Sequence, residues 1–133
     1  MKTFYMMCGL SRAGKTTYAQ KLAEETGAVL VCRDDELYFN QSMGFFAAEL
    51  IAQQKVHELL KNGKSVIYDS MALVPGERQM ILNRCRTQDC KTVCVFVNTP
   101  REVIEQRGGR IPYEALIPPT DNEGFDEIIV INN

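Results

Sequence analysis

The sequence lacks several features that would assign its function from composition alone. Its 15 Lys and Arg residues against 17 Asp and Glu leave a net charge of −2, so no overall positive field attracts it to nucleic acid. A nucleic-acid substrate would therefore need a local cluster of arginine and lysine. The single histidine, His57, and the absence of C-x-x-C spacing argue against a zinc site. No apolar run approaches the length of a membrane span, so we expect no membrane partner.

Repeats, low-complexity tracts and interdomain linkers are also absent. The length of 133 residues and the hydrophobic content of 45% therefore predict one domain, residues 1–133, with a core of its own. The five cysteines are an odd number, and no secretory signal opens the sequence. Together these observations predict reduced thiols and a cytoplasmic location.

The sequence does contain a phosphate-binding motif. Residues 9–16 read G-L-S-R-A-G-K-T, which matches G-x-x-x-x-G-K-[ST] in full. An apolar, strand-like run over residues 3–8 precedes it and a helical run over residues 17–25 follows it. A chance match in a glycine-containing turn is the alternative, but the strand before and the helix after favour phosphate binding.

Each part of the motif has a chemical reason. Glycine at positions 9 and 14 lets the backbone turn tightly and approach a phosphate, and the loop amides and helix N-terminus present positive charge to it. Lys15 can reach the β- and γ-phosphates of ATP, and the Thr16 hydroxyl can ligate Mg²⁺. We therefore expect ATP and Mg²⁺ as cofactors. The predicted nucleotide-binding residues are Gly9, Ser11, Arg12, Ala13, Gly14, Lys15, Thr16 and Thr17.

Strand-like and helical segments alternate along the chain. Strands are predicted over residues 3–8, 28–32, 65–68, 92–97 and 125–131, and helices over 17–25, 42–61, 75–86 and 100–107, with Ser42 as a helix N-cap. The wholly apolar run 28–32 suits a strand buried on both faces. This order predicts an α/β fold with a five-stranded parallel sheet and helices on both faces. Phe45 and Phe46 are expected in the core, and Arg78, Arg84 and Arg86 on a solvated helix face.

Polar residues follow the predicted strands, where ligands of parallel sheets bind. Asp34 comes after the second strand, and its carboxylate can accept the proton of an attacking hydroxyl. Asp35 better fits a helix cap. Asp69 ends the third strand, as the acid that supports Mg²⁺ does in phosphate-loop proteins. A loop acid and a turn residue are the respective alternatives for Asp34 and Asp69.

Two arginines flank Gly108-Gly109 after the fourth strand. Arg107 and Arg110 can bind phosphate oxygens in bidentate geometry, and the two glycines allow movement. The segment from about residue 106 to 112 is therefore predicted to be a lid over the triphosphate, with a solvated helix end as the alternative.

These segments together resemble the P-loop kinase family that contains the polynucleotide 5′-hydroxyl kinases, the zeta-toxin-like kinases and related small-molecule kinases. The resemblance covers the phosphate loop, the R-D-D run at residues 33–35, the segments 66–71 and 75–78, and residues 97–110. It implies a P-loop NTPase fold and transfer of the ATP γ-phosphate to a hydroxyl. By this resemblance, Asp34 is the general base, and Lys15, Arg107 and Arg110 act on the phosphates.

The resemblance points first to a polynucleotide 5′-hydroxyl as acceptor, but one residue differs. Polynucleotide kinases carry an arginine shortly after the catalytic aspartate, whereas this chain has Asp35-Glu36-Leu37-Tyr38. A small-molecule kinase acting on a sugar, nucleoside or antibiotic is therefore an alternative, as is an ATP-binding module without turnover. The expected acceptor entrance is largely aromatic, formed by Leu37, Tyr38, Phe39, Met43 and Phe45.

Overall fold

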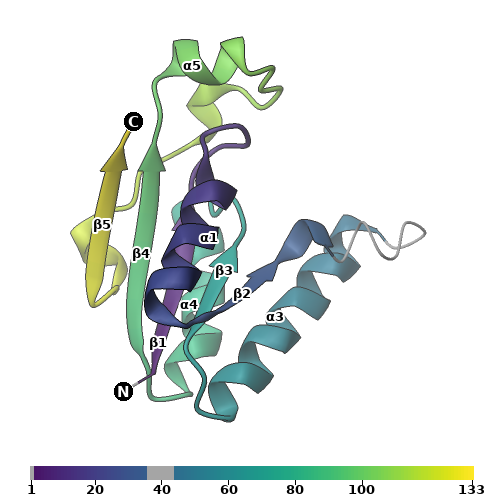
Figure 1. Cartoon of the computed structure of the whole chain (residues 1–133), viewed down its shortest axis with the longest axis vertical. Coiled ribbons are helices and arrows are strands. Elements are labelled where there is room, and N and C mark those ends of the chain that lie inside the picture. The colour runs from purple at the N-terminus through teal and green to yellow at the C-terminus, as the bar shows by residue number, and fades with distance from the viewer. Residues whose placement is uncertain (1, 36–43) are drawn as a thin grey trace.

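The chain, described here from a computed structural model, forms a three-layer α/β structure (Figure 1). The structure describes residues 2–35 and 44–133. The strands are β1 (Thr3–Cys8), β2 (Val29–Cys32), β3 (Val66–Asp69), β4 (Lys91–Asn98) and β5 (Glu127–Asn132). The helices are α1 (Lys15–Thr26), α3 (Phe45–Lys61), α4 (Pro75–Arg86) and α5 (Arg101–Gln106), with short 3₁₀ turns at Tyr113–Ala115 and Asp121–Glu123.

All five strands pair in parallel, in the order β2-β3-β1-β4-β5. Their carboxyl ends therefore meet at one edge of the sheet, and Figure 1 shows α5 beyond that edge, on the same side as the loop after β1. The α/β fold class and the five-stranded parallel sheet predicted from the sequence are confirmed.

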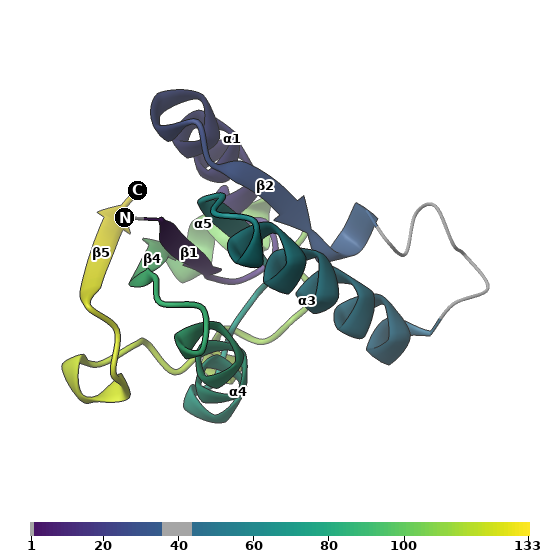
Figure 2. The same cartoon turned by 90° about the horizontal axis from the view of Figure 1, so that it is seen from below.

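Helices pack on both faces of the sheet, as predicted. Side chains of α3 and α4, including Val56, Leu60 and Leu82, pack on one face against alternate residues of β1 and β3. Side chains of α1 and α5, including Leu22 and Ile104, pack on the other face. Figure 2 shows α1 and α4 on opposite sides of the sheet. This double cover explains why β1, β3 and β4 are apolar along most of their lengths.

Two predictions about the burial of apolar side chains are wrong. The run 28–32 forms β2, which among the described strands pairs with β3 alone and lies at an edge, so Val29 is 38% exposed and Val31 is the one buried residue of the strand. Phe46 is 74% exposed on α3 rather than in the core, because it lies on the face of that helix turned away from the sheet. The predicted N-cap Ser42 lies outside the described residues, and α3 is preceded by Gly44.

Candidate functional site

The phosphate-loop motif forms the turn between β1 and α1. Gly14 precedes α1 with a φ of 94°, a left-handed conformation that favours glycine. At Gly9, an added Cβ would lie 3.1 Å from the main-chain oxygen of Val97, which is closer than side chains normally pack. Glycine is thus needed at Gly14 for its backbone angle and at Gly9 for its close approach to β4.

Two loop amides are used within the protein. The Gly9 N–H donates to the Met71 oxygen at 2.9 Å, and the Ala13 N–H donates to the Leu10 oxygen at 3.1 Å. The Gly9 bond connects the start of the loop to the segment after β3. These two residues therefore shape the loop with their amides engaged. Leu10 is buried in the core, and the remaining motif residues line a cavity.

That cavity lies at the carboxyl edge of the sheet and has a volume of about 520 Å³. It brings together residues from the loop, from α1, from the end of β2 and from the end of β3. Its polar lining consists of Ser11, Arg12, Gly14, Lys15, Thr16, Thr17, Arg33, Asp34, Asp69 and Ser70. Nearly all the residues predicted to bind nucleotide or metal, and Asp34, thus share one cavity.

Asp69 connects β3 to the start of α1. The Thr16 hydroxyl donates to Asp69 Oδ2 at 2.8 Å, and Lys15 Nζ lies 3.5 Å from Oδ1. The Asp69 side chain is almost fully buried, and its Oδ1 accepts no hydrogen bond from any described residue. A buried carboxylate oxygen beside a threonine hydroxyl is a donor set of the kind that Mg²⁺ prefers, so these residues fit that ion.

Asp34 enters the cavity from a helical turn, residues 33–35, that directly follows β2. Its carboxylate is 75% exposed, whereas the neighbouring Arg33 is buried. Arg33 Nε lies 3.7 Å from Asp34 Oδ1, and Arg33 Nη1 lies 3.6 Å from Glu49 Oε2 on α3. Asp35 points elsewhere, because it lines a separate cavity between β2 and α3. Only the first of the two adjacent aspartates therefore faces the phosphate loop.

The link from Asp34 continues across α3. Gln53 Nε2 donates to Glu49 Oε1 at 2.8 Å, and Arg84 on α4 donates to Gln53 Oε1. Ion pairs and hydrogen bonds thus connect Asp34, Arg33, Glu49, Gln53 and Arg84 in sequence. The Asp34 carboxylate is therefore connected to α3 and α4 through these side chains.

The two candidate lid arginines lie differently. Arg107, just after α5, donates from Nη1 to the Arg12 main-chain oxygen at 3.0 Å, so it contacts the phosphate loop directly. Arg110 is exposed and lines a smaller cavity, of about 270 Å³, formed by α5 and the segment after it. The structure therefore places Arg107 at the loop and Arg110 beside it.

The outer side of the phosphate loop is fixed by the residues that directly follow β4 and β5. The Thr99 hydroxyl donates to the Ala13 oxygen at 2.7 Å, and Asn133 Nδ2 lies 3.2 Å from the same oxygen. Asn133 Nδ2 also lies 2.9 Å from Thr99 Oγ1. These bonds hold the Ala13 carbonyl away from the cavity.

Arg78 differs from its predicted place on a solvated helix face. It is fully buried, and its guanidinium donates to both carboxylate oxygens of Glu123 at 2.7 and 3.1 Å and to the Ala72 oxygen at 2.7 Å. Ala72 follows the segment whose Met71 oxygen accepts the Gly9 N–H. Arg78 therefore stabilises the segment after β3 to which the phosphate loop is hydrogen-bonded.

The predicted acceptor entrance falls mostly outside the described part of the chain. Leu37, Tyr38, Phe39 and Met43 lie outside the described residues, and of Phe45 only the main chain is described. In the described part of the chain, no group of three or more His, Cys, Asp or Glu side chains is arranged to hold a metal ion. No helix among the described residues has the length and apolar character needed to cross a membrane.

The family model described as an AAA domain matches residues 4–110, which include every residue that lines the cavity except Ile111. The chain belongs to this family. The match places the phosphate loop, Asp34, Asp69 and both candidate lid arginines inside the AAA domain. A comparison with curated proteins gives no match.

Solved structures share the fold of this AAA domain. A Chloroflexus aurantiacus protein with a provisional kinase assignment aligns with a TM-score of 0.77 and 16% identity, over 98% of this chain and 88% of that chain. A chain of the Pnkp1/Rnl/Hen1 complex aligns with a TM-score of 0.72 and 22% identity, over 94% of this chain but only 43% of that chain. The APS kinase CysC of Mycobacterium tuberculosis, in complex with AMPPNP and APS, aligns with a TM-score of 0.64 and 16% identity, over 97% and 88% of the two chains. The fold is thus that of P-loop kinase-like proteins.

Several residues around the cavity of the AAA domain carry no recognisable sequence signal. Glu49 lies within an amphipathic helix, and Thr99 and Asn133 lie in short polar runs. Arg33 does carry one, since it is a charged residue directly after an apolar strand, but its pairing with a carboxylate 16 positions later depends on how α3 packs. These contacts are tertiary and are visible only in the structure.

Proposed function

We propose that the protein transfers the γ-phosphate of ATP to a hydroxyl group, with a polynucleotide 5′-hydroxyl as the leading acceptor. The observation that carries this proposal is that Asp34 lines the same cavity as Lys15, Thr16 and Asp69. A candidate base thus lies opposite a phosphate-binding loop, and that juxtaposition is what transfer to a hydroxyl needs.

In this proposal, the loop residues bind the phosphates. The motif residues that line the cavity hold the β- and γ-phosphates, with Lys15 supplying positive charge where negative charge gathers during transfer. Thr16 and Asp69 would hold Mg²⁺, which when bound would neutralise part of the charge of the phosphates. Arg107, already at the loop, adds a planar donor to the phosphates.

Asp34 acts on the acceptor. Its exposed carboxylate accepts the proton of the acceptor hydroxyl as the oxygen attacks the γ-phosphorus, and ADP leaves. Arg33 positions Asp34, because it is buried and is itself fixed by Glu49. Asp35 takes no part, since it lies in another cavity.

A small-molecule acceptor is the second candidate, and one observation favours it. Apart from the loop residues Arg12 and Lys15, the described cation that lines the cavity is Arg33, and it is already paired with carboxylates. Little positive charge is therefore available for the phosphates of a nucleic-acid strand. Structural neighbours named as a sugar kinase and a gluconokinase are in keeping with such an acceptor.

The test is ADP release from Mg·ATP in the presence and absence of acceptors. A 5′-hydroxyl oligonucleotide is compared with the same oligonucleotide carrying a 5′-phosphate, and gluconate, a nucleoside and APS are tested in parallel. Stimulation by the 5′-hydroxyl form alone supports the leading proposal, and stimulation by a small molecule supports the second. ATP binding without stimulation by any acceptor would favour a binding module and overturn both.

A further inference from the structure

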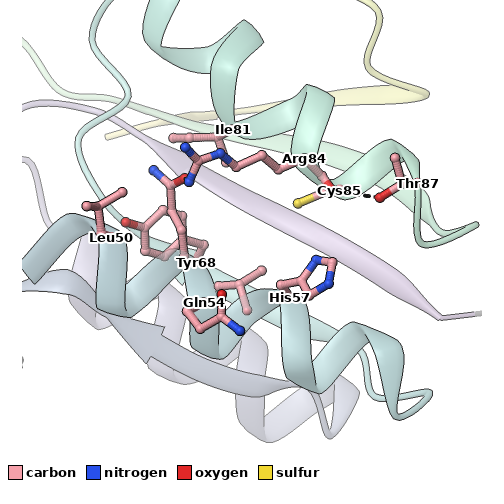
Figure 3. Close-up of a pocket in the computed structure, with 10 residues that line it drawn as sticks. Leu50, Gln54, His57, Tyr68, Ile81, Arg84, Cys85 and Thr87 are labelled. Carbon is pink, nitrogen blue, oxygen red and sulfur yellow. Dashed lines mark hydrogen bonds between the residues drawn. The ribbon is translucent and has the colours of Figure 1, made fainter.

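A second cavity lies between α3 and α4, on the sheet face opposite α1 (Figure 3). Its volume is about 470 Å³, within the range of sites for small organic molecules. No residue that lines it also lines the phosphate-loop cavity. The α3–α4 cavity is thus a separate hollow, and the proposed phosphoryl transfer does not use it.

The base of the α3–α4 cavity is apolar and well buried. Val56 from α3, Ile81 and Cys85 from α4, and the ring of Tyr68 from β3 are each less than 5% exposed. Figure 3 shows the Tyr68 ring between the side chains of the two helices. A ligand with an apolar body could therefore transfer its own apolar surface from water onto this buried base.

The charge of the lining has one sign. Arg84 lines the cavity, and no aspartate or glutamate is among its lining residues. The Arg84 guanidinium uses Nη1 to hold Gln53 in place, and an arginine side chain has five N–H donors in all. An anionic group at this end would find a positioned donor and no described carboxylate in the lining to repel it.

Tyr68 is the least exposed of the four side chains at the base of the cavity, and its hydroxyl lies beside the Glu49 carboxylate of α3. Burial, together with a hydrogen bond to Glu49 and the charge of that carboxylate, raises the pKa of Tyr68 well above its usual range, so the hydroxyl keeps its proton at neutral pH. Tyr68 therefore offers its ring to a ligand, and Arg84 is the charged donor of the cavity.

We infer that the α3–α4 cavity binds a small organic anion with an apolar body, whose charged group is bound by Arg84 and whose body packs on Val56, Ile81 and Tyr68. This site is additional to the phosphate-loop cavity. It requires neither ATP nor phosphoryl transfer, so its test can fail while the proposed function holds, and the reverse is equally possible.

The experiment uses two fluorescent naphthalenes that differ in charge. Anilinonaphthalene sulfonate is an apolar anion, and N-phenyl-1-naphthylamine is its neutral counterpart. We expect saturable binding of the anion by the full chain, unchanged by saturating Mg·ATP. Arg84→Gln should weaken it about tenfold or more, because a hydrogen bond to a charged group contributes roughly 1.5–3 kcal/mol. The neutral compound should bind Arg84→Gln and the unmodified protein equally.

Two further variants make the test specific. Arg86→Gln is the matched control, since Arg86 is exposed on the same helix and does not line the cavity. Leu50→Trp, at the 41% exposed rim, should fill the cavity and weaken binding of both compounds. Equal losses in Arg84→Gln and Arg86→Gln, binding that does not saturate, or displacement of the anion by Mg·ATP would each overturn the inference. Unfolding midpoints near that of the unmodified protein establish that the variants are folded.

Discussion

The guanidinium of Arg78 and the carboxylate of Glu123 form a bidentate ion pair inside the protein, with N–O distances of 2.7 and 3.1 Å. Arg78 comes from α4 and Glu123 from the 3₁₀ turn before β5, so the pair joins segments 45 positions apart. Arg78 also binds the Ala72 oxygen, close to where β3 contacts the phosphate loop. A single buried side chain thus connects the C-terminal segment to the back of the site.

Removing Arg78 should strongly destabilise the protein. Arg78→Met leaves the Glu123 carboxylate buried without its partner, a change that typically costs about 3–5 kcal/mol of the free energy of unfolding. Arg86→Met, at an exposed position of the same helix, should change it by less than about 0.5 kcal/mol. Denaturant unfolding of both variants measures the difference. Similar losses of unfolding free energy in the two variants would show that the buried ion pair contributes no more to stability than an exposed arginine does.

The same pair should make stability depend on pH. Burial alone would raise the pKa of Glu123, but hydrogen bonds from Arg78 and Thr120 outweigh it, and the pKa lies below the usual carboxyl value. Its contribution to stability is therefore present above the unfolded pKa of about 4.3 and is lost as pH falls through the lower folded pKa. Glu123→Gln should be less stable than the unmodified protein at pH 7, with a difference that shrinks towards pH 3. A difference independent of pH would contradict the lowered pKa.

Loss of the loop cation or hydroxyl should abolish nucleotide chemistry without unfolding the protein. Lys15→Ala and Thr16→Ala are expected to weaken Mg·ATP binding or turnover strongly, because both side chains meet at Asp69 beside the cavity. Lys21→Ala, an exposed lysine on the same helix, is the matched control. Calorimetric titration with Mg·ATP gives the affinities. Normal binding and turnover in both loop variants would refute the proposed role of the motif.

Substitution of the two adjacent aspartates should affect the rate of phosphoryl transfer differently. Asp34→Asn is expected to retain ATP affinity and lose about 10²–10⁴-fold in the rate of phosphoryl transfer, as typical for loss of a general base. Asp35→Asn should be nearly silent, since Asp35 lines a different cavity. Single-turnover rates with the acceptor found in the screen decide between them. A larger loss of transfer rate in Asp35→Asn than in Asp34→Asn would assign the role of general base to Asp35 instead.

Arg107 and Arg110 should likewise differ. Arg107 already contacts the Arg12 oxygen of the loop, so Arg107→Ala should lower transfer more than Arg110→Ala. Residues 106–112 should also gain protection from hydrogen exchange when Mg·ATP binds, if they close over the phosphates as a lid. Protection that is the same with and without nucleotide would argue against closure while leaving a fixed role for Arg107.

Local signals in the sequence predicted the parts of the fold that depend on local physics. The spacing of apolar residues and the positions of proline and glycine predicted the strands and helices. For example, α4 occupies residues 75–86 as predicted, because Pro75 suits the first turn of a helix. The phosphate-binding loop was predictable from its motif at residues 9–16, because the glycines, the lysine and the threonine each have a chemical role there. The end of β3 at Asp69 followed in the same way, from an acid after an apolar run.

The wrong predictions concern residues whose burial depends on contacts with segments distant in the sequence. Composition cannot distinguish an edge strand from a central one, so the apolar run 28–32 predicts a strand buried on both faces, whereas β2 is at the edge of the sheet that the described strands form. A charged residue on a helix is usually solvated, and Arg78 departs from this because Glu123 meets it from a distant segment. Phe46 shows the opposite error, because an aromatic side chain is usually buried, whereas Phe46 is exposed on a face of α3 that does not pack on the sheet.

The bracing of the Ala13 carbonyl has a consequence for how the protein is made. Thr99 and Asn133 bind this oxygen from positions 86 and 120 residues further along the chain. During synthesis Ala13, within the phosphate-binding motif, is therefore made 86 residues before Thr99 and 120 residues before Asn133, the two residues whose side chains fix the outer side of the loop. Because contacts so distant in sequence form late and cost much loop-closure entropy, a fully braced loop is a product of the finished sheet.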